Sequence, residues 1–440
     1  MPTAVPPGPT SAVDVHLAFE EDRMGYLRDL AERYGDVVRV GERAWLVNDP
    51  GAARHVLQTT GTEFTTVSDF LGRSVPARRY DSHHQAAING VHALLARWAT
   101  APRLSRIQEH VRRLLPAGEG ILDPLPLGRR IGVALATEAC LGQPDPKVEQ
   151  DSVRLLDTLL PKLSSPWLLP GWVPTPRNLR LARRDATLTR RFTKVPTAPD
   201  AWGQDTIRTL LRRRSPAELG FSTATDTWIK KLLLASQEPT GAAPAWALHR
   251  MLTAPEWLAR VESEVADVDP LGAELTDPLR QLPVTSAVVF ESLRLHPPTW
   301  LISRRVLVET DLCGFPASPG QIIYLSPWLL HQNAEAYPDP LAFRPDRWLD
   351  PQQRKRSQQG YFAFSRGPHS CPGRLPSLAL TVCLVGALVR RYELTSDGGQ
   401  VGTDARRSML PVGVRLRIRP RPATPPADQT AGTRRSRGDR

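Results

Sequence analysis

A cysteine near the C-terminus, set between glycines and followed at once by a long apolar run, constrains the fold of this 440-residue chain more than any other feature. Residues 364–374 read FSRGPHSCPGR, and the run LPSLALTVCLVGALV that follows predicts a buried helix. Gly367 and Gly373 allow the backbone to turn tightly around Cys371. Because Cys371 comes just before a helix N-terminus, backbone amides and the helix dipole favour its thiolate form.

The same loop predicts a metal-ligand role for Cys371. An isolated cysteine is more often a buried structural residue. Here, however, two glycines, Phe364 and a following helix surround the cysteine at fixed offsets. A thiolate that is shielded by an aromatic ring and held by amide donors is a good axial ligand for haem iron. We therefore interpret Cys371 as the metal ligand of a haem.

Composition narrows the class of protein further. Hydrophobic residues make up 41% of the chain and charged residues 23%, which excludes a wholly disordered or collagen-like protein. The four cysteines form no CxxC pair, which argues against a disulfide scaffold or a zinc ribbon and favours a reducing, cytoplasmic location. No apolar run approaches about 18 residues and no secretory signal opens the chain, so we expect no membrane anchor.

The net charge of +12 raises the question of a nucleic-acid partner. Much of the excess is local, because it lies in the Arg- and Pro-rich tail and in arginine clusters that are typical of polar helix faces. No zinc finger, RNA-binding signature or basic–aromatic alternation accompanies it. We therefore expect no nucleic-acid partner.

Apolar periodicity predicts one domain that is mainly α with small β-sheets. The predicted elements are a helix over 16–35, a β-hairpin over 36–48, a helix opened by Asp49-Pro50, mostly helical chain over 91–250, and strands over 302–325 and 412–420. The expected organisation is a flexible Pro-rich segment over 1–15, the single domain over 16–420, and a basic, disordered tail over 421–440.

Three motifs in this order give the chain a family resemblance. They are Phe364, Gly367, Cys371 and Gly373 in a Phe-x-x-Gly-x-x-x-Cys-x-Gly loop, Glu291-Ser-Leu-Arg294, and Phe343-Arg-Pro345-Asp-Arg347-Trp348. The first matches the ligand loop of the cytochrome P-450 haem-thiolate monooxygenases, and the others are similar to that family's Glu-x-x-Arg and Pro-x-Arg segments. Over roughly residues 16–420 the chain resembles the soluble, bacterial type of this family.

The resemblance implies haem b, with Cys371 as axial thiolate, between a long distal helix and the proximal loop and helix. It implies that His369 and Arg304 contact the haem propionates, although Arg305 is adjacent. It also implies that Glu291, Arg294 and Arg347 form a structural charge triad with no part in bond making. Further candidate haem contacts are Ala235 and, among residues that spacing does not separate, His83, His84, His92, Arg97 and Trp98.

The distal helix departs from the family pattern Ala-Gly-x-Asp/Glu-Thr. In LASQEPT, Ser236 replaces the glycine, Glu238 keeps the acid, and Pro239 takes the position of the usual threonine, with Thr240 one residue later. Proline inside a helix removes an amide donor and clashes with the preceding turn, which predicts a kink. The candidate catalytic residues are Gln237, Glu238, Pro239 and Thr240.

Because the family's threonine hydroxyl helps to deliver protons, three interpretations stay open. Thr240 takes its place across the kink; Glu238 relays protons through ordered water; or the reaction needs less controlled protonation. The last would suit oxidative coupling or cyclisation of an aromatic or peptide substrate without oxygen insertion.

Substrate contacts are predicted by position alone. The candidates are the loop over 68–79, Leu234, Gln237, the segment 300–302 (Trp300, Leu301 and Ile302), Met409 and Leu410, although Trp300 is more often a packing residue. The predicted function is a monomeric oxidase that activates O2 to hydroxylate or epoxidise a substrate of specialised metabolism. Its electrons would come from NAD(P)H through a reductase and a ferredoxin or flavodoxin. The alternatives are a coupling enzyme, a non-catalytic haem sensor or electron-transfer protein, and a degenerate scaffold that needs a partner enzyme.

Overall fold

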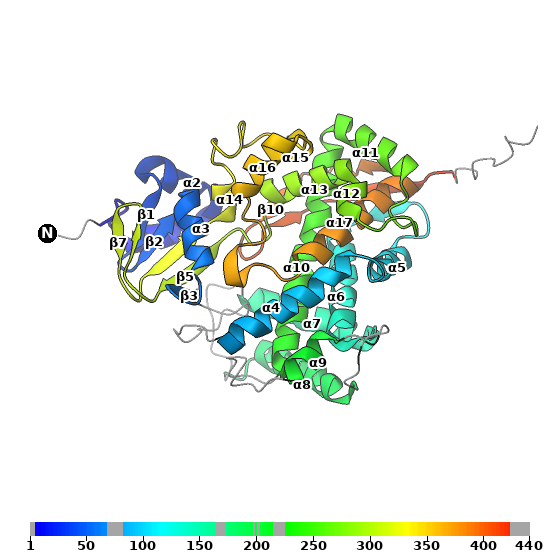
Figure 1. Cartoon of the computed structure of the whole chain (residues 1–440), viewed down its shortest axis with the longest axis horizontal. Helices are drawn as coiled ribbons and strands as arrows, with labels where there is room; N and C mark the ends of the chain where they lie inside the picture. The colour runs from blue at the N-terminus through cyan, green and yellow to red at the C-terminus, as the bar shows by residue number, and fades with distance from the viewer. Residues whose placement is uncertain are drawn as a thin grey trace, which may run out of the picture.

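The computed structural model describes residues 5–67, 82–163, 173–196, 199, 203, 205–213 and 225–422. A large helical part lies beside a smaller part that is rich in strands (Figure 1). Helix α10 (Thr225–Leu252) passes through the helical part and packs along α6 (Pro124–Leu141). It also contacts α13 (Pro283–Leu295) and α17 (Arg374–Arg391). The predicted fold class, mainly α with small sheets, is confirmed.

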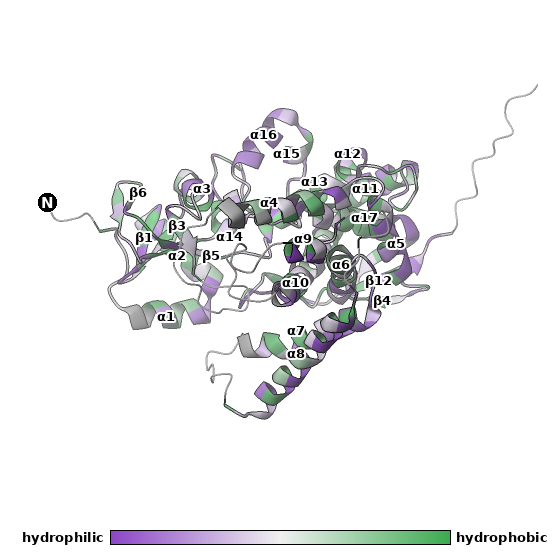
Figure 2. Cartoon of the chain, turned by 60° about the horizontal axis from the view of Figure 1, so that its bottom comes forward, coloured by the Kyte–Doolittle hydropathy of each residue, from purple (hydrophilic) through white to green (hydrophobic). Residues whose placement is uncertain are grey.

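The other helices surround these four. They are α1 (Ala12–Glu21), α2 (Arg23–Tyr34), α3 (Pro50–Gln58), α4 (Ser82–Ala96), α5 (Leu104–Leu114), α7 (Pro146–Leu163), α8 (Pro176–Lys194), α9 (Ile207–Arg212), α11 (Pro255–Asp267), α12 (Pro278–Gln281), α14 (Pro327–Leu330), α15 (Asp346–Leu349) and α16 (Pro351–Gln359), with 3₁₀ turns η1 (Arg97–Ala99) and η2 (Gly367–His369). Figure 2 shows α7 and α8 side by side, projecting from the rest of the molecule. No helix in the described ranges combines the length and apolar character needed to cross a bilayer.

The strands form four small sheets in the described part of the chain. They are β1 (Val37–Gly41), β2 (Ala44–Val47), β3 (Phe64–Thr66), β4 (Gly120–Leu122), β5 (Ile302–Val306), β6 (Thr310–Leu312), β7 (Phe315–Ala317), β8 (Ile322–Leu325), β9 (Tyr392–Ser396), β10 (Gly402–Asp404), β11 (Leu410–Val412) and β12 (Leu416–Pro420). The largest has the order β1-β2-β8-β5-β3. In its register Thr66 lies opposite Arg304, which brings residues 238 positions apart to one edge of the sheet.

Local sequence explains where the N-terminal elements begin and end. The predicted hairpin is β1–β2, and Asp49 caps α3 by accepting a hydrogen bond from the Ala52 amide at 2.6 Å. The single helix predicted over 16–35 is wrong, because α1 and α2 are separate. Asp22 leaves the helical conformation with φ −142° and caps α2. Helix α2 ends at Gly35, as expected, where φ is 86°.

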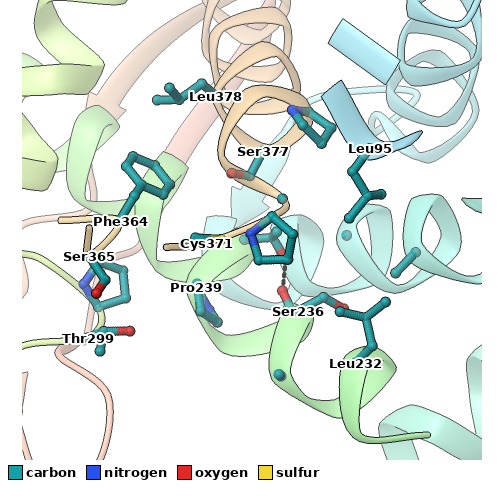
Figure 3. Close-up of a pocket in the computed structure, with 18 of the residues that line it drawn as sticks. Leu95, Leu232, Ser236, Pro239, Thr299, Phe364, Ser365, Cys371, Ser377 and Leu378 are labelled. Atoms are coloured by element: carbon teal, nitrogen blue, oxygen red, sulfur yellow. Dashed lines mark hydrogen bonds between the residues drawn. The ribbon is translucent and has the colours of Figure 1, made fainter. Parts of the chain in front are cut away.

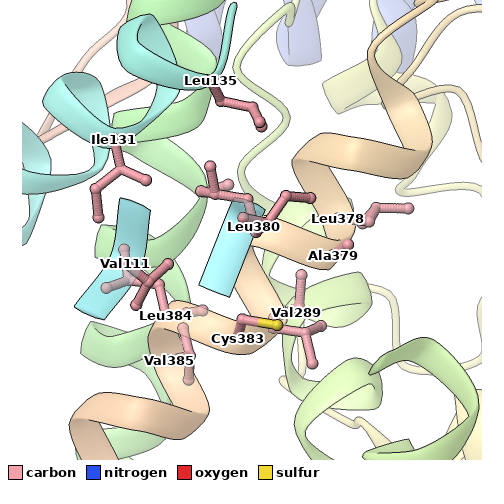
Figure 4. Packing of buried hydrophobic residues seen from close by; sticks show 14 of the residues in the cluster. Val111, Ile131, Leu135, Val289, Leu378, Ala379, Leu380, Cys383, Leu384 and Val385 are labelled. Atoms are coloured by element: carbon pink, nitrogen blue, oxygen red, sulfur yellow. The ribbon is translucent and has the colours of Figure 1, made fainter. Parts of the chain in front are cut away.

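Helix α17 is buried around most of its circumference, as its continuous apolar sequence predicts. Figure 4 shows the core that it forms with neighbouring helices, in which Leu378, Ala379, Leu380, Cys383, Leu384 and Val385 of α17 meet Val111, Ile131, Leu135 and Val289. A helix that is packed on all sides is a rigid support. The loop that precedes α17 is therefore held at a fixed place against the core.

Two of the predicted segments lie outside the described residues. These are the loop over 68–79 and the tail from 423 onward. The side chains of His83 and His84 also lie outside the described set. At the start of the tail, Arg421 is held by the carbonyls of Val389 and Tyr392, at 3.2 and 3.1 Å.

Candidate active site

The ligand loop is closed by a backbone hydrogen bond. The Cys371 amide donates to the Phe364 carbonyl at 2.8 Å, after a reversal in which Ser365 and Gly367 have φ of 57° and 70°. A Cβ on Gly367 would lie 2.3 Å from the Leu57 carbonyl oxygen, so glycine is needed there both for its φ and for space. Gly373 is different, because its φ is an ordinary −83°.

The Cys371 thiol lies on the wall of a cavity (Figure 3). Burial raises its pKa to about 11, while a hydrogen bond from the Gly373 amide and the charge of Arg374 act in the opposite direction. The amide donor predicted at this helix N-terminus is therefore present. A bound metal ion would add the positive charge that keeps such a thiol deprotonated.

The cavity has a volume of about 420 Å³ and lies between the ligand loop and α10. Most of its wall is apolar, and Arg304 and His369 are the basic residues among the described ones that line it. Further lining residues are Thr66, Leu95, Trp98, Gly132, Leu135, Leu232, Ala235, Ser236, Pro239, Thr240, Ala243, Thr299, Ile302 and Phe364. The cavity thus joins one sulfur ligand to apolar walls and two basic groups.

One face of α10 lines the cavity. Leu232, Ala235, Ser236, Pro239, Thr240 and Ala243 follow each other at helical spacing and all lie on the wall. Gln237 and Glu238 lie elsewhere on the helix. Gln237 is fully buried, and its side-chain amide donates to the Leu233 carbonyl at 3.1 Å. Pro239 does not end the helix, which is continuous from 225 to 252.

Glu238 points to a chain segment near the C-terminus. Its carboxylate, 2% exposed as a residue, accepts a hydrogen bond from the Ser408 hydroxyl at 2.8 Å and lies 3.4 Å from Nε of Arg407. Its contacts therefore tie α10 to the segment before β11. A proton path from Glu238 to the cavity is not among the contacts of the described residues.

Arg304 and His369, the two residues expected to contact the propionates, lie at the cavity, and His92 is not on its described wall. Arg304, on β5, is buried and donates from Nε to the Thr60 hydroxyl at 3.0 Å. His369, in η2, also lies on the wall. Arg304 is on the described cavity wall and Arg305 is not, so Arg304 is the better placed of the two for a propionate contact. His92, on α4, is half-buried and lies outside the described cavity wall, whereas Trp98 is part of it.

The charge triad is assembled in the interior, on the proximal side. Glu291 and Arg294 are both 0% exposed and are joined by two hydrogen bonds of 2.9 and 2.8 Å. Nε of Arg347 donates to the Glu291 carboxylate at 3.1 Å. Two more donors to this carboxylate were not predicted, namely the Trp348 indole N–H at 2.9 Å and the Arg344 amide at 2.9 Å.

A buried histidine, missed in the sequence, connects the triad to the ligand loop. Nδ1 of His331 lies 2.8 Å from the Arg294 carbonyl, and its Nε2 accepts from the Phe362 amide at 2.8 Å. Burial lowers the pKa of His331 to about 3, so the ring is neutral and its Nδ1 carries the proton. The signal in the sequence was LLHQN, where a histidine interrupts an apolar helix end.

The predicted substrate residues need correction. Leu234, Trp300, Leu301, Met409 and Leu410 are not among the described residues that line the cavity. Leu234 lies on the core side of α10. Trp300 stacks on Phe19 at 6.3 Å and donates to the Arg407 carbonyl at 3.0 Å, and Met409 is fully buried in the same cluster, with Leu301 packed against it. Of the predicted segment 300–302, Ile302 lies on the cavity wall, and the wall also includes Leu232 and Thr299, which were not predicted.

The residues present fit a haem. A sulfur ligand faces the cavity, and the space beside it is not crowded, since a Cβ on Gly373 would meet only that sulfur, at a van der Waals distance of 3.9 Å. Apolar walls suit the porphyrin face, and Arg304 and His369 suit two carboxylates. This fold and this site define a protein that holds a thiolate-ligated haem beneath a long helix.

Comparison with known proteins gives the same result. The model of the cytochrome P450 family matches residues 187–416, and the chain belongs to this family and is a cytochrome P450 monooxygenase. The chain is 26% identical over 420 residues to a cyclooctat-9-en-7-ol 5-monooxygenase of Streptomyces melanosporofaciens, with 89% of each protein covered. It is 28% identical over 288 residues to a pentalenene oxygenase of Streptomyces avermitilis, covering 63% of this chain and 64% of that protein.

The fold is also shared with a solved structure. A crystal structure of a cytochrome P450 superposes with a TM-score of 0.71 at 18% identity, covering 92% of this chain and 98% of that one. At this identity the match concerns the fold alone. It agrees with the predicted arrangement of a long helix opposite a cysteine loop.

Proposed function

We propose that this monooxygenase uses haem b with Cys371 as axial thiolate and oxidises an apolar organic molecule of specialised metabolism. The single observation that carries the proposal is the placement of Cys371 on the wall of an apolar cavity, directly across from α10. The two Streptomyces relatives are named for oxygenation of cyclooctat-9-en-7-ol and pentalenene. A terpenoid-like substrate suits a wall with so few polar groups.

The chain's own residues would bind and orient the group and its substrate. Cys371 would ligate the iron, and Arg304 and His369 would hold the two carboxylates of the haem. When bound, haem supplies the oxidation chemistry by activating dioxygen with two electrons, aided by the electron-rich thiolate. The apolar side chains around the cavity would exclude water. Thr240, the residue after Pro239 on α10, would supply the hydroxyl that Pro239 lacks.

A second candidate reaction is oxidative coupling or ring closure. The observation that favours it is that Pro239, which has no hydroxyl, lies on the cavity wall where the family's threonine is expected. Mass spectrometry of the products separates the two reactions. A gain of one oxygen indicates hydroxylation or epoxidation, and a loss of two hydrogens indicates coupling or cyclisation.

The thiolate assignment is tested by spectroscopy of the reduced protein with carbon monoxide. Wild-type protein reconstituted with haem is expected to show the red-shifted Soret band of a thiolate-ligated haem, because sulfur donates electron density to the iron. Cys371→Ser is expected to lose that band while Cys383→Ser, which changes a buried cysteine elsewhere on α17, keeps it. A Cys371→Ser protein with an unchanged spectrum would contradict the proposal.

We also propose that electrons come from NAD(P)H through a small acidic carrier, a ferredoxin or flavodoxin. The support is a group of basic residues around the ligand loop, namely the half-buried Arg54 and Arg366 and the exposed Arg374, together with Arg354, Lys355 and Arg356 of α16. The Arg366 guanidinium donates to the Gln359 carbonyl at 2.9 Å, which places the end of α16 beside the loop. The three cations of α16 are all exposed, and α16 has no acidic residue.

Reduction by a reduced acidic ferredoxin is therefore expected to slow as salt increases, because screening weakens attraction between opposite charges. Lys355→Glu is expected to lower the rate at low salt. Lys194→Glu, the same charge change at the end of α8, is the matched control, since Figures 1 and 2 place α8 and α16 on different sides of the molecule. A rate that does not respond to salt would speak against this docking surface.

A further inference from the structure

Two glycines on α6 pack against the part of α10 that departs from the family pattern. Gly128 and Gly132 lie one helical turn apart, and both face Thr240. A Cβ on Gly132 would lie 1.9 Å from the Thr240 hydroxyl oxygen and 2.6 Å from its Cβ. The Thr240 side chain therefore occupies the space that any side chain at position 132 would need.

The two glycines accommodate different parts of Thr240. A Cβ on Gly128 would lie 2.5 Å from the Thr240 carbonyl oxygen, whereas a Cβ on Gly132 would meet the side chain. Pro244 has no amide hydrogen, so this carbonyl also lacks its usual donor four residues later in the helix. Gly128 thus fits the backbone of α10, and Gly132 fits the hydroxyl-bearing side chain.

The position of the hydroxyl is further restricted by a hydrogen bond. Oγ1 of Thr240 donates to the Ser236 carbonyl at 2.6 Å. A hydroxyl has one proton and two lone pairs, so this bond leaves acceptor capacity on the oxygen. Gly132, Ser236 and Thr240 all lie on the cavity wall. The hydroxyl is therefore a fixed acceptor at the edge of the cavity.

We propose that Gly132 is a positioning residue for the reaction, which acts through Thr240 by leaving the space that fixes its hydroxyl at the cavity. Pro239 has no hydroxyl at the position where the family usually has one. Because Gly132 on α6 has no side chain, Thr240 has room to place its own hydroxyl at the cavity. The inference rests on the proposed function, since it concerns proton control in a haem-thiolate oxidase. It adds a residue on a different helix from the family motif.

The test compares Gly132→Ala, Thr240→Val and the double variant, using reconstituted holoenzyme. Thr240→Val keeps the shape of the side chain and removes its hydroxyl. Both single variants are expected to raise the hydrogen peroxide released per electron pair consumed by about three- to tenfold, the equivalent of one net hydrogen bond. The double variant is expected to release the same peroxide fraction as Thr240→Val. Without a hydroxyl at position 240, the methyl group of Gly132→Ala displaces no group that controls protonation.

A crystal structure of Gly132→Ala supplies a readout that does not depend on turnover. It is expected to show the Thr240 hydroxyl moved away from the Ser236 carbonyl. Gly386→Ala is the matched control, because its new Cβ would meet Pro270 Cγ at 2.8 Å, in a contact between α17 and the residues after α11 that is not part of the described cavity wall. This control is expected to lower thermal stability and to leave the peroxide fraction at the wild-type level.

Two results would overturn the inference: a wild-type peroxide fraction in Gly132→Ala, or additive effects in the double variant, which would indicate general distortion. If Gly132→Ala does not fold, adding Thr240→Gly removes the side chain that the new methyl group overlaps and is expected to restore folding. Failure to restore folding also overturns the inference. Loss of the thiolate band in wild-type protein would instead refute the proposed function. The two failures are therefore distinguishable.

Discussion

Arg294→Leu is expected to destabilise the fold by about 3–5 kcal/mol, the cost of breaking a buried ion pair, and to yield protein that loses haem during purification. The Arg294 guanidinium makes five hydrogen bonds, two to Glu291 and one each to the carbonyls of His331, Pro340 and Ala342. Leucine satisfies none of them. The change leaves the carbonyls of His331, Pro340 and Ala342 without this donor, the first of them in a fully buried residue, and it leaves a fully buried carboxylate with one cation fewer.

Haem loss is expected because the same contacts support the ligand loop. Arg294 holds the segment over 331–342, and His331 in that segment accepts the hydrogen bond of the Phe362 amide, two residues before the loop begins. Releasing the segment therefore releases the chain that carries Cys371. The measurement is the ratio of haem absorbance to protein absorbance, together with urea unfolding followed by tryptophan fluorescence.

Arg344→Leu is the matched control for Arg294→Leu. The Arg344 side chain is 44% exposed and pairs with an exposed Asp339 at 2.7 Å, so its loss is expected to change stability by about 0–1 kcal/mol. Arg294→Lys is expected to fall between the two, because an ammonium has three donors and cannot reproduce the planar fork. If Arg294→Leu were as stable as Arg344→Leu, the buried network would not support the fold.

This contrast also shows what the sequence could predict about the triad. Spacing alone placed Glu291 and Arg294 on one helix face, where such pairs are usually exposed and weak. Family resemblance added Arg347. The carbonyls that bind Arg294 come from residues 37 to 48 positions further along the chain, and the sequence carries no local pattern for them. Burial and the large energetic effect follow from tertiary packing.

The cavity wall was predicted less well, for a physical reason. Placing Pro239 at the active site fixes which face of α10 meets the cavity, and residues three, four and seven positions away share that face. Leu232, Ala235 and Ala243 follow from this rule, and Leu234 does not. The α6 contribution could not be predicted, because a glycine's role depends on the helix that packs against it. Gly132 is informative only once Thr240 is opposite.

The ligand loop shows the same division between local and tertiary causes. Its glycines predicted a tight turn, and Gly367 does have φ of 70°. The end of α3 also presses against it, since a Cβ on Gly367 would lie 2.3 Å from the Leu57 carbonyl oxygen and 2.7 Å from the Cα of Gln58. The second constraint comes from Leu57 on α3, 310 positions earlier in the chain, which the loop sequence does not reveal.

Gly367→Ala is therefore expected to destabilise the holoprotein in two ways. The left-handed backbone conformation costs about 1–2 kcal/mol for an alanine. Overpacking against backbone atoms of α3 adds about 1–3 kcal/mol. The added methyl group cannot move the α3 backbone without moving its core residues, so the loop is expected to shift instead. The expected result is reduced haem retention and a smaller thiolate-type band with carbon monoxide.

Gly398→Ala separates these two causes, and the comparison decides whether α3 holds the ligand loop in place. Gly398 has φ of 80°, and a Cβ there would meet no atom within 4 Å, so this variant carries the backbone cost alone. Gly398→Ala is expected to keep the full haem content, and the difference in unfolding free energy between the two variants measures the contact with Leu57 and Gln58. Equal stability and equal haem content in both would show that the loop accommodates the methyl group. In that case the position of Cys371 would depend on α17 and the Phe364 carbonyl alone.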